Sequence, residues 1–183
     1  MSEPKPKSMS GGPSQRSWRS GLGHPLTRLG MVVIAVIIVL DQIIKAYMLQ
    51  VLNLDEVLFI PISPLFNLTM VWNTGVSFGL LSAEADWGRW ALIVLSLAIS
   101  TLLFSWLLRA ERRLSAVSFG LIIGGAIGNV IDRVRYGAVA DFLDFSGLWF
   151  PYVFNIADAA ITVGVILLIL DGLRPVPSQP AEH

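Results

Sequence analysis

Four long apolar segments dominate this 183-residue sequence and restrict it to a small set of folds. They run approximately over residues 29–49, 90–108, 115–132 and 156–173. A helix of about 18 or more predominantly apolar residues can cross the hydrocarbon core of a bilayer, which is about 30 Å thick. With 54% apolar and 14% charged residues, the composition also lies outside the range of soluble domains. The sequence therefore predicts a membrane protein with four transmembrane helices.

Positive charges gather near one set of segment ends and predict the orientation of the chain. They are Lys5, Lys7, Arg16, Arg19 and Arg28 before the first segment, Arg109, Arg112 and Arg113 between the second and third, and Arg174 after the fourth. Because cytoplasmic loops carry an excess of Lys and Arg, we expect both termini in the cytoplasm. Residues 1–28, rich in Pro, Ser and Gly, then form a disordered basic cytoplasmic tail. Residues 174–183 form a second cytoplasmic tail, and residues 29–173 form the membrane domain.

The two connections on the opposite side cover residues 50–89 and 133–155. In the first, runs such as VLFIPI and FNLTMVW are broken by prolines and by Asn-Thr-Gly, a pattern typical of short strands and turns. We therefore expect an all-α polytopic membrane protein whose four transmembrane helices carry a small extracytoplasmic β-sheet platform. The segment NTGVSFG combines Asn73, Gly75 and Phe78, which suits a loop closing over a lipid-facing site, although a plain turn explains the same residues.

Ionisable residues inside apolar segments are energetically expensive and mark either functional sites or paired supports. In the first segment, Asp41 and Lys45 are spaced i, i+4 with the acid first, which is the favourable order on a helix. They form either a mutually neutralising pair, with Lys45 extending to the interface, or a pair that helps to hold a site. In the third segment, Gly120, Gly124 and Gly128 form a ridge of small residues that lets another helix approach closely.

The outer end of the third segment carries a polar trio. Asn129, Asp132 and Arg133 fall at i, i+3 and i+4 and therefore project from one face of a helix. A surface ion pair between Asp132 and Arg133 is the simpler interpretation, but adjacent residues on a helix do not face each other. We expect the trio to brace a neighbouring site.

Two further acids, Asp141 and Asp158, have the positions expected of reactive groups. Asp141 lies on the loop after the third segment, Asp158 opens the fourth, and a returning loop could bring them face to face. Two carboxyls close together do not ionise equally, so one holds a proton while the other stays charged. Such a pair can activate a water and protonate a leaving amine. Nothing in the spacing of Asp144 points to chemistry, and we expect it to be a solvated loop acid.

The sequence gives little support for catalysis by cysteine or histidine, for a metal site or for nucleic-acid binding. Cysteine is absent, which excludes a thiol nucleophile, and His24 and His183 lie in the two tails, so neither histidine catalysis nor a metal site is predicted. The net charge is zero and there is no basic groove with interleaved aromatics, so no nucleic-acid partner is indicated. Two acids near a membrane surface also suit a proton- or ion-coupled transporter, and the residues alone leave that alternative open.

Five motifs in order carry a family resemblance: DQIIK at 41–45, NTGVSFG at 73–79, GGAIGNVIDR at 124–133, VADF at 139–142 and FNIAD at 154–158. Together, over approximately residues 29–172, they resemble the bacterial lipoprotein signal peptidases (signal peptidase II). The resemblance implies an aspartic endopeptidase of the bacterial inner membrane with its active site at the periplasmic face. Such an enzyme removes signal peptides from diacylglyceryl-modified prolipoproteins, cutting just before the lipid-bearing cysteine.

The resemblance also implies roles for individual residues. It makes Asp141 and Asp158 the catalytic pair. The residues that line, bind or support the site would be Asn73, Gly75, Phe78, Asn129, Arg133, Asn155, Asp41, Lys45 and Asp132. The implied partners are diacylglyceryl-modified prolipoproteins, membrane lipids and a cyclic peptide inhibitor of the globomycin type, and no metal or organic cofactor is implied.

Overall fold

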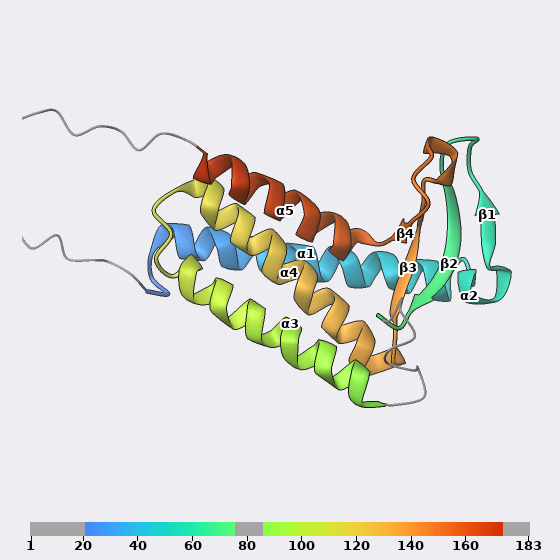
Figure 1. Ribbon diagram of the computed structural model, residues 1–183, viewed down its shortest axis with the longest axis horizontal. Helices are drawn as coiled ribbons and strands as arrows, with labels where there is room; N and C mark the ends of the chain where they lie inside the picture. Colours follow the sequence, from blue (N-terminus) through green and yellow to red (C-terminus); the bar gives the residue numbers. More distant parts are fainter. Residues whose placement is uncertain (1–20, 76–85, 174–183) are drawn as a thin grey trace, which may run out of the picture.

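The computed structural model describes residues 21–75 and 86–173. Its helices are α1 (Pro25–Gln50), α2 (Leu54–Val57), α3 (Asp86–Leu107), α4 (Arg113–Tyr136) and α5 (Ile156–Gly172), with a short 3-10 helix at Ser146–Leu148. Its strands are β1 (Phe59–Pro61), β2 (Asn67–Asn73), β3 (Val139–Asp144) and β4 (Val153–Phe154). The four long helices lie alongside one another and the sheet stands at one end of the bundle (Figure 1). The start of α1 and the end of α5 both lie at the other end (Figure 1).

The predicted fold class, a helical membrane protein with a small sheet, is confirmed. Helices α1, α3 and α4 are each long and apolar enough to cross a membrane, and α5, with 17 residues, is at the lower limit of spanning length. Helix α1 begins at Pro25, so residues 25–28 belong to the helix and not to the preceding tail. The reason is local, because the His24 side chain accepts a hydrogen bond from the Leu26 N–H and Pro25 occupies the first turn, where its missing N–H costs nothing.

Helix α4 is the centre of the bundle and packs against α1, α3 and α5. Its predicted glycine ridge faces α1. A Cβ atom on Gly124 would lie 2.9 Å from the Ile37 Cβ, and one on Gly128 would lie 2.7 Å from a carboxylate oxygen of Asp41. The ridge therefore allows the close approach that the sequence predicts, and it brings the acid of α1 against the outer half of α4.

The sheet is antiparallel, with strand order β1-β2-β3-β4. We expected strands only within residues 50–89 and a loop at Asp141, and this expectation was wrong, because β3 and β4 both come from residues 133–155. Strand β3, VADFLD, is almost entirely buried, so it lacks the alternation of apolar and polar residues that identifies a half-exposed strand. Its Phe142 is fully buried in a cluster that joins the sheet to the end of α1. Asp141 thus lies on a rigid inner strand, opposite Val71 of β2.

Candidate active site

Asp141 and Asp158 are held at the sheet end of the bundle by two different devices. Asp141 is 1% exposed on β3. Asp158 is half-buried in the first turn of α5, where it forms a capping box with Asn155. In this box the Asn155 side-chain oxygen accepts from the Asp158 N–H at 2.9 Å, and the Asn155 N–H donates to the Asp158 carboxylate at 3.4 Å. The FNIAD motif is therefore a helix start that also orients an acid.

Two asparagines connect the two acids. The Asn155 side chain, which is fully buried, donates to Asp141 at 2.6 Å and to the side-chain oxygen of Asn129 at 3.2 Å. The Asn129 amide in turn donates to Asp158 at 2.7 Å. Asn155 contacts both carboxyl groups, Asp141 through its side chain and Asp158 through its backbone. The structure thus brings together four of the residues that the sequence singled out.

The surroundings of Asp141 favour its protonated form. Burial raises the pKa of the Asp141 carboxyl to about 6, and the nearby charge of Asp158 acts in the same direction. Hydrogen bonds from the side chains of Asn73, at 3.0 Å, and Asn155 oppose this rise because they stabilise the carboxylate. Asp158, by contrast, lies at the positive end of the α5 dipole, where negative charge is favoured. The two acids therefore sit in unlike environments.

Beneath the two acids lies a buried ionic cluster that joins α1 to α4. Lys45, only 2% exposed, lies 2.8 Å from a carboxylate oxygen of Asp41 and 2.7 Å from one of Asp132, and both of these acids are fully buried. The expected pairing of Asp41 with Lys45 is observed. The interpretation in which Lys45 extends to the interface is wrong, because the glycine ridge brings Asp132 of α4 within reach of its ammonium group.

This cluster also anchors the backbone next to each candidate catalytic acid. The Asp132 carboxylate accepts from the Ala140 N–H at 3.2 Å, and the Asp41 carboxylate accepts from the Ala157 N–H at 3.1 Å. Ala140 directly precedes Asp141, and Ala157 directly precedes Asp158. Asp132 is therefore not in a surface pair with Arg133; it fixes the entry to β3, as Asp41 fixes the entry to α5.

Arg133 and the turn after β2 complete the described part of the site. Arg133 is half-buried, its guanidinium donates to the Asn129 carbonyl at 3.4 Å, and it interacts electrostatically with Asp158 and Asp141. Gly75 has φ +83°, and a Cβ atom there would collide with Leu92 and lie 3.4 Å from the Arg133 guanidinium. The positive φ of this turn favours glycine, whatever the space around it. Phe78, the remaining predicted residue of this loop, lies outside the described residues.

Two polar residues were missed or misjudged from the sequence, Gln42 beside the ionic cluster and Asp144 on β3, away from the two acids. The Gln42 side-chain amide donates to Asp132 at 3.0 Å, to Asp41 at 3.2 Å and to the Gly128 carbonyl at 3.4 Å. In the sequence, the only indication of a role for Gln42 is that it is a polar residue within an apolar segment. Asp144 was expected to be a solvated loop acid, which was wrong, because it is 8% exposed on β3 and accepts from the Thr69 hydroxyl at 2.6 Å. Hydrogen bonds from Thr69 and Ser146 hold the pKa of Asp144 below its ordinary value.

The arrangement has the chemical requirements of an acid-base pair. Burial raises the pKa of the Asp141 carboxyl, Asp158 accepts a hydrogen bond from Asn129, and both acids are positioned by amides and by backbone anchors. Within residues 21–75 and 86–173, no group of three or more His, Cys, Asp or Glu side chains is placed to hold a metal ion.

Comparisons with known proteins cover the whole site. The family model described as signal peptidase (SPase) II matches residues 33–174. Over 150 residues the chain is 52% identical to the lipoprotein signal peptidase of Caulobacter vibrioides, covering 80% of this chain and 89% of that protein. It is 46% identical over 157 residues to the lipoprotein signal peptidase of Methylorubrum extorquens, covering 84% and 91%. A solved structure of a bacterial membrane enzyme is also similar, with a TM-score of 0.69 at 25% identity over 84% of this chain and 93% of that one.

Proposed function

Because the chain belongs to the signal peptidase II family, it is a lipoprotein signal peptidase, and we propose that Asp141 and Asp158 are the two acids with which it cleaves its substrates. The protein is a multi-pass membrane protein and an aspartic endopeptidase that removes signal peptides from prolipoproteins. The family assignment decides against the ion-coupled transporter that the residues alone had left open. The observation that carries the proposal is the contact of Asn155 with both carboxyl groups, which holds two acids of unlike environment at one site.

In the proposed reaction Asp158 is the base and Asp141 the acid. The Asp158 carboxylate takes a proton from a water, whose oxygen attacks the scissile carbonyl carbon, while the Asp141 carboxyl gives its proton to the carbonyl oxygen. The product of this step is a neutral tetrahedral diol. When the carbonyl reforms, one diol hydroxyl returns a proton to Asp141, Asp158 passes its proton to the amide nitrogen, and the carbon-nitrogen bond breaks. Both acids are thereby restored to their starting states.

The neighbouring residues support this assignment of roles. Asn129 and Asn155 donate to the Asp158 carboxylate, which suits the group that begins the cycle charged. Burial of Asp141 suits the group that begins it protonated. Arg133, which interacts electrostatically with both acids, would limit the cost of negative charge at the site. Asn73 and Gly75, with Phe78, would form the loop that closes over the substrate.

The position of the site at one end of a bundle of apolar helices supports a proposal for the substrate class (Figure 1). There, one part of a substrate can remain in lipid while the bond to be cut reaches water. We propose diacylglyceryl-modified prolipoproteins that are cut just before the lipidated cysteine. Burial of acyl chains contributes about 0.8 kcal/mol per methylene, so lipid between the helices would dominate recognition. Membrane lipids and cyclic peptides of the globomycin type would compete for the same surface.

The proposed location is the bacterial inner membrane, with both termini in the cytoplasm and the site at the periplasmic face. The support is the charge distribution. Arg109, Arg112 and Arg113 connect α3 to α4 at the end of the bundle opposite the sheet, and cytoplasmic loops carry an excess of such residues.

The test is cleavage of a purified lipidated prolipoprotein by Asp141→Asn and Asp158→Asn. Each change keeps the shape of the side chain but removes the proton chemistry, so we expect each to lower the rate at least ~100-fold, the lower end of the contribution of a general acid or base. Asp144→Asn is the matched control, because it makes the same change on the same strand, three positions away and thus on the opposite face. It should retain cleavage within about twofold. Wild-type rates for Asp141→Asn or Asp158→Asn would remove that acid from the mechanism.

A further inference from the structure

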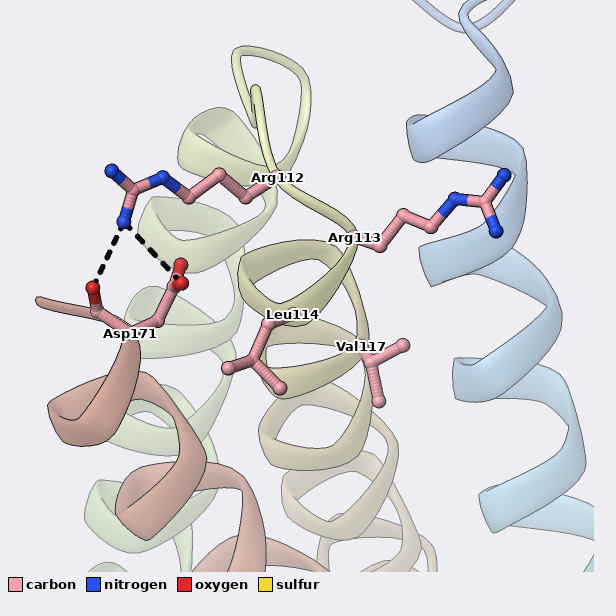
Figure 2. Close-up of a pocket in the computed structure, with 5 residues that line it drawn as sticks. All are labelled: Arg112, Arg113, Leu114, Val117 and Asp171. Atoms are coloured by element: carbon pink, nitrogen blue, oxygen red, sulfur yellow. Dashed lines mark hydrogen bonds and ion pairs between the residues drawn. The ribbon is translucent and has the colours of Figure 1, made fainter. Parts of the chain in front are cut away.

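The end of the bundle opposite the two acids carries a cleft of about 440 Å³, formed where α4 begins and α5 ends. Its lining residues are Arg112, Arg113, Leu114, Val117 and Asp171. Arg112 extends toward Asp171 on α5, whereas Arg113 extends in the other direction, toward α1, so the two guanidinium groups lie on opposite sides of the start of α4 (Figure 2). The cleft is distant from the peptidase site and has no part in the chemistry proposed for it.

The rim of the cleft carries net positive charge. Arg112 donates to the Asp171 carbonyl at 3.0 Å and lies 3.5 Å from its carboxylate, and the Ser115 hydroxyl also donates to that carboxylate. This pair joins α4 to α5 and neutralises one arginine. Arg113 is exposed, and its side chain has no hydrogen bond or ion pair within the described part of the chain. One guanidinium group is therefore available to an anion from outside the protein.

The floor of the cleft is aliphatic. Leu114 and Val117 are partly exposed on one face of α4, and Leu121, one turn further along that face, is partly exposed as well. The first turn of α4 adds donors at the top of this apolar strip, because its N-cap residue Arg112 makes no side-chain capping bond and the turn contains no acid. Cationic groups thus stand above hydrocarbon, at the end of helices that are long and apolar enough to cross a membrane.

We propose that this cleft binds an anionic phospholipid, with its phosphate near Arg113 and the start of α4 and one acyl chain along Leu114 and Val117. A soluble anion would use the guanidinium groups but would leave the aliphatic floor exposed to water. A zwitterionic headgroup would bring its own cation toward Arg113. An anionic lipid such as phosphatidylglycerol satisfies both surfaces, and in the proposed orientation the cleft faces the cytoplasmic leaflet, where basic residues attract anionic lipid.

The test is native mass spectrometry of the purified full-length protein in detergent, titrated with phosphatidylglycerol or phosphatidylcholine. We expect tighter binding of phosphatidylglycerol, and about a fivefold loss of that affinity in Arg113→Gln, since one basic residue contributes about 1 kcal/mol and 1.4 kcal/mol is tenfold. Arg28→Gln is the matched control. It removes the same charge from an exposed position on the first helix, at the same end of the bundle, but does not line the cleft. Its affinity should stay within about twofold of wild type.

A second variant tests the apolar half of the site without changing charge. Val117→Phe fills part of the floor and should lower phosphatidylglycerol binding while leaving any binding of inorganic phosphate unchanged. Equal losses in Arg113→Gln and Arg28→Gln would show a diffuse surface attraction and overturn the proposal. Equal affinities for the two lipids would overturn it as well, and so would full competition by inorganic phosphate at the concentration of the lipid.

Discussion

Replacing Lys45 by Met tests whether the buried ionic cluster positions the two catalytic acids. Methionine has similar length and no charge, so the change removes the ammonium group that lies 2.8 Å from Asp41 and 2.7 Å from Asp132 while leaving little empty volume. Two buried carboxyls then face each other without a cation. The change therefore alters charge far more than packing.

The expected magnitude has two parts. Removing one partner of a buried ion pair costs about 3–5 kcal/mol, because an uncompensated charge remains. At about 2–4 °C per kcal/mol for a protein of this size, the melting temperature should fall by about 6–20 °C. Catalysis should also suffer in the folded variant. The carboxylates of Asp132 and Asp41 hold the N–H groups of Ala140 and Ala157. A displacement of about 1 Å at a reacting group can cost about 100-fold in rate.

The assay combines thermal unfolding in detergent with single-turnover cleavage measured well below the melting temperature of the variant. Arg135→Met is the control, because Arg135 is an exposed cation on α4, the helix that carries Asp132, and it reaches the cluster through a 3.4 Å hydrogen bond to Gln42. It should melt within about 2 °C of wild type and cleave normally, as surface substitutions usually do. If Lys45→Met melted and cleaved like Arg135→Met, the cluster would have neither role. A lower melting temperature with a wild-type rate would show that the cluster holds the bundle but does not position the acids.

The remaining predictions concern the protonation of the catalytic acids and the orientation of the protein in the membrane. The rate of single-turnover cleavage in nanodiscs should fall as the pH rises through about 6, because the Asp141 carboxyl, whose pKa burial raises to about 6, then loses its proton. Arg133→Gln removes a nearby cation that favours carboxylate, so it should move this limb to higher pH, and an unchanged or lowered limb would show that Arg133 does not act electrostatically on Asp141. For the orientation, Glu56→Cys and Glu111→Cys place single thiols at exposed positions on opposite ends of the bundle of a chain that has no cysteine. In intact cells an impermeant thiol reagent should label only the first, and labelling of the second alone or of both would contradict the proposed topology.

The parts of the fold that the sequence predicts are those set by local pattern. Apolar runs long enough to span a bilayer predicted α1, α3 and α4, and the spacing of three glycines predicted the close approach of a second helix. The pairing of Asp41 with Lys45 was predictable because residues four apart on a helix are neighbours. Each of these inferences needs only the length, the composition or the helical period of one segment.

The parts that the sequence did not predict depend on contacts between distant segments. Strand β3 is buried on both faces, so its residues show no alternation, and its register against β2 passes through an irregularity between Leu68 and Val71. The burial of Asp144 follows from that register, since its partner is the Thr69 hydroxyl on β2. The link from Lys45 to Asp132 joins helices far apart in the chain. No periodicity in one segment contains this information.

The cluster explains why a site at the membrane surface depends on residues inside the bundle. The two acids, Asp141 and Asp158, lie on β3 and in the first turn of α5. Their backbones are fixed by carboxylates from α1 and α4. Those carboxylates meet because Gly128 lets Asp41 approach α4, where Lys45 neutralises part of the charge. The geometry of the acids is therefore set by how closely α1 and α4 pack. A substitution in the glycine ridge should displace the two acids, just as a substitution beside them would.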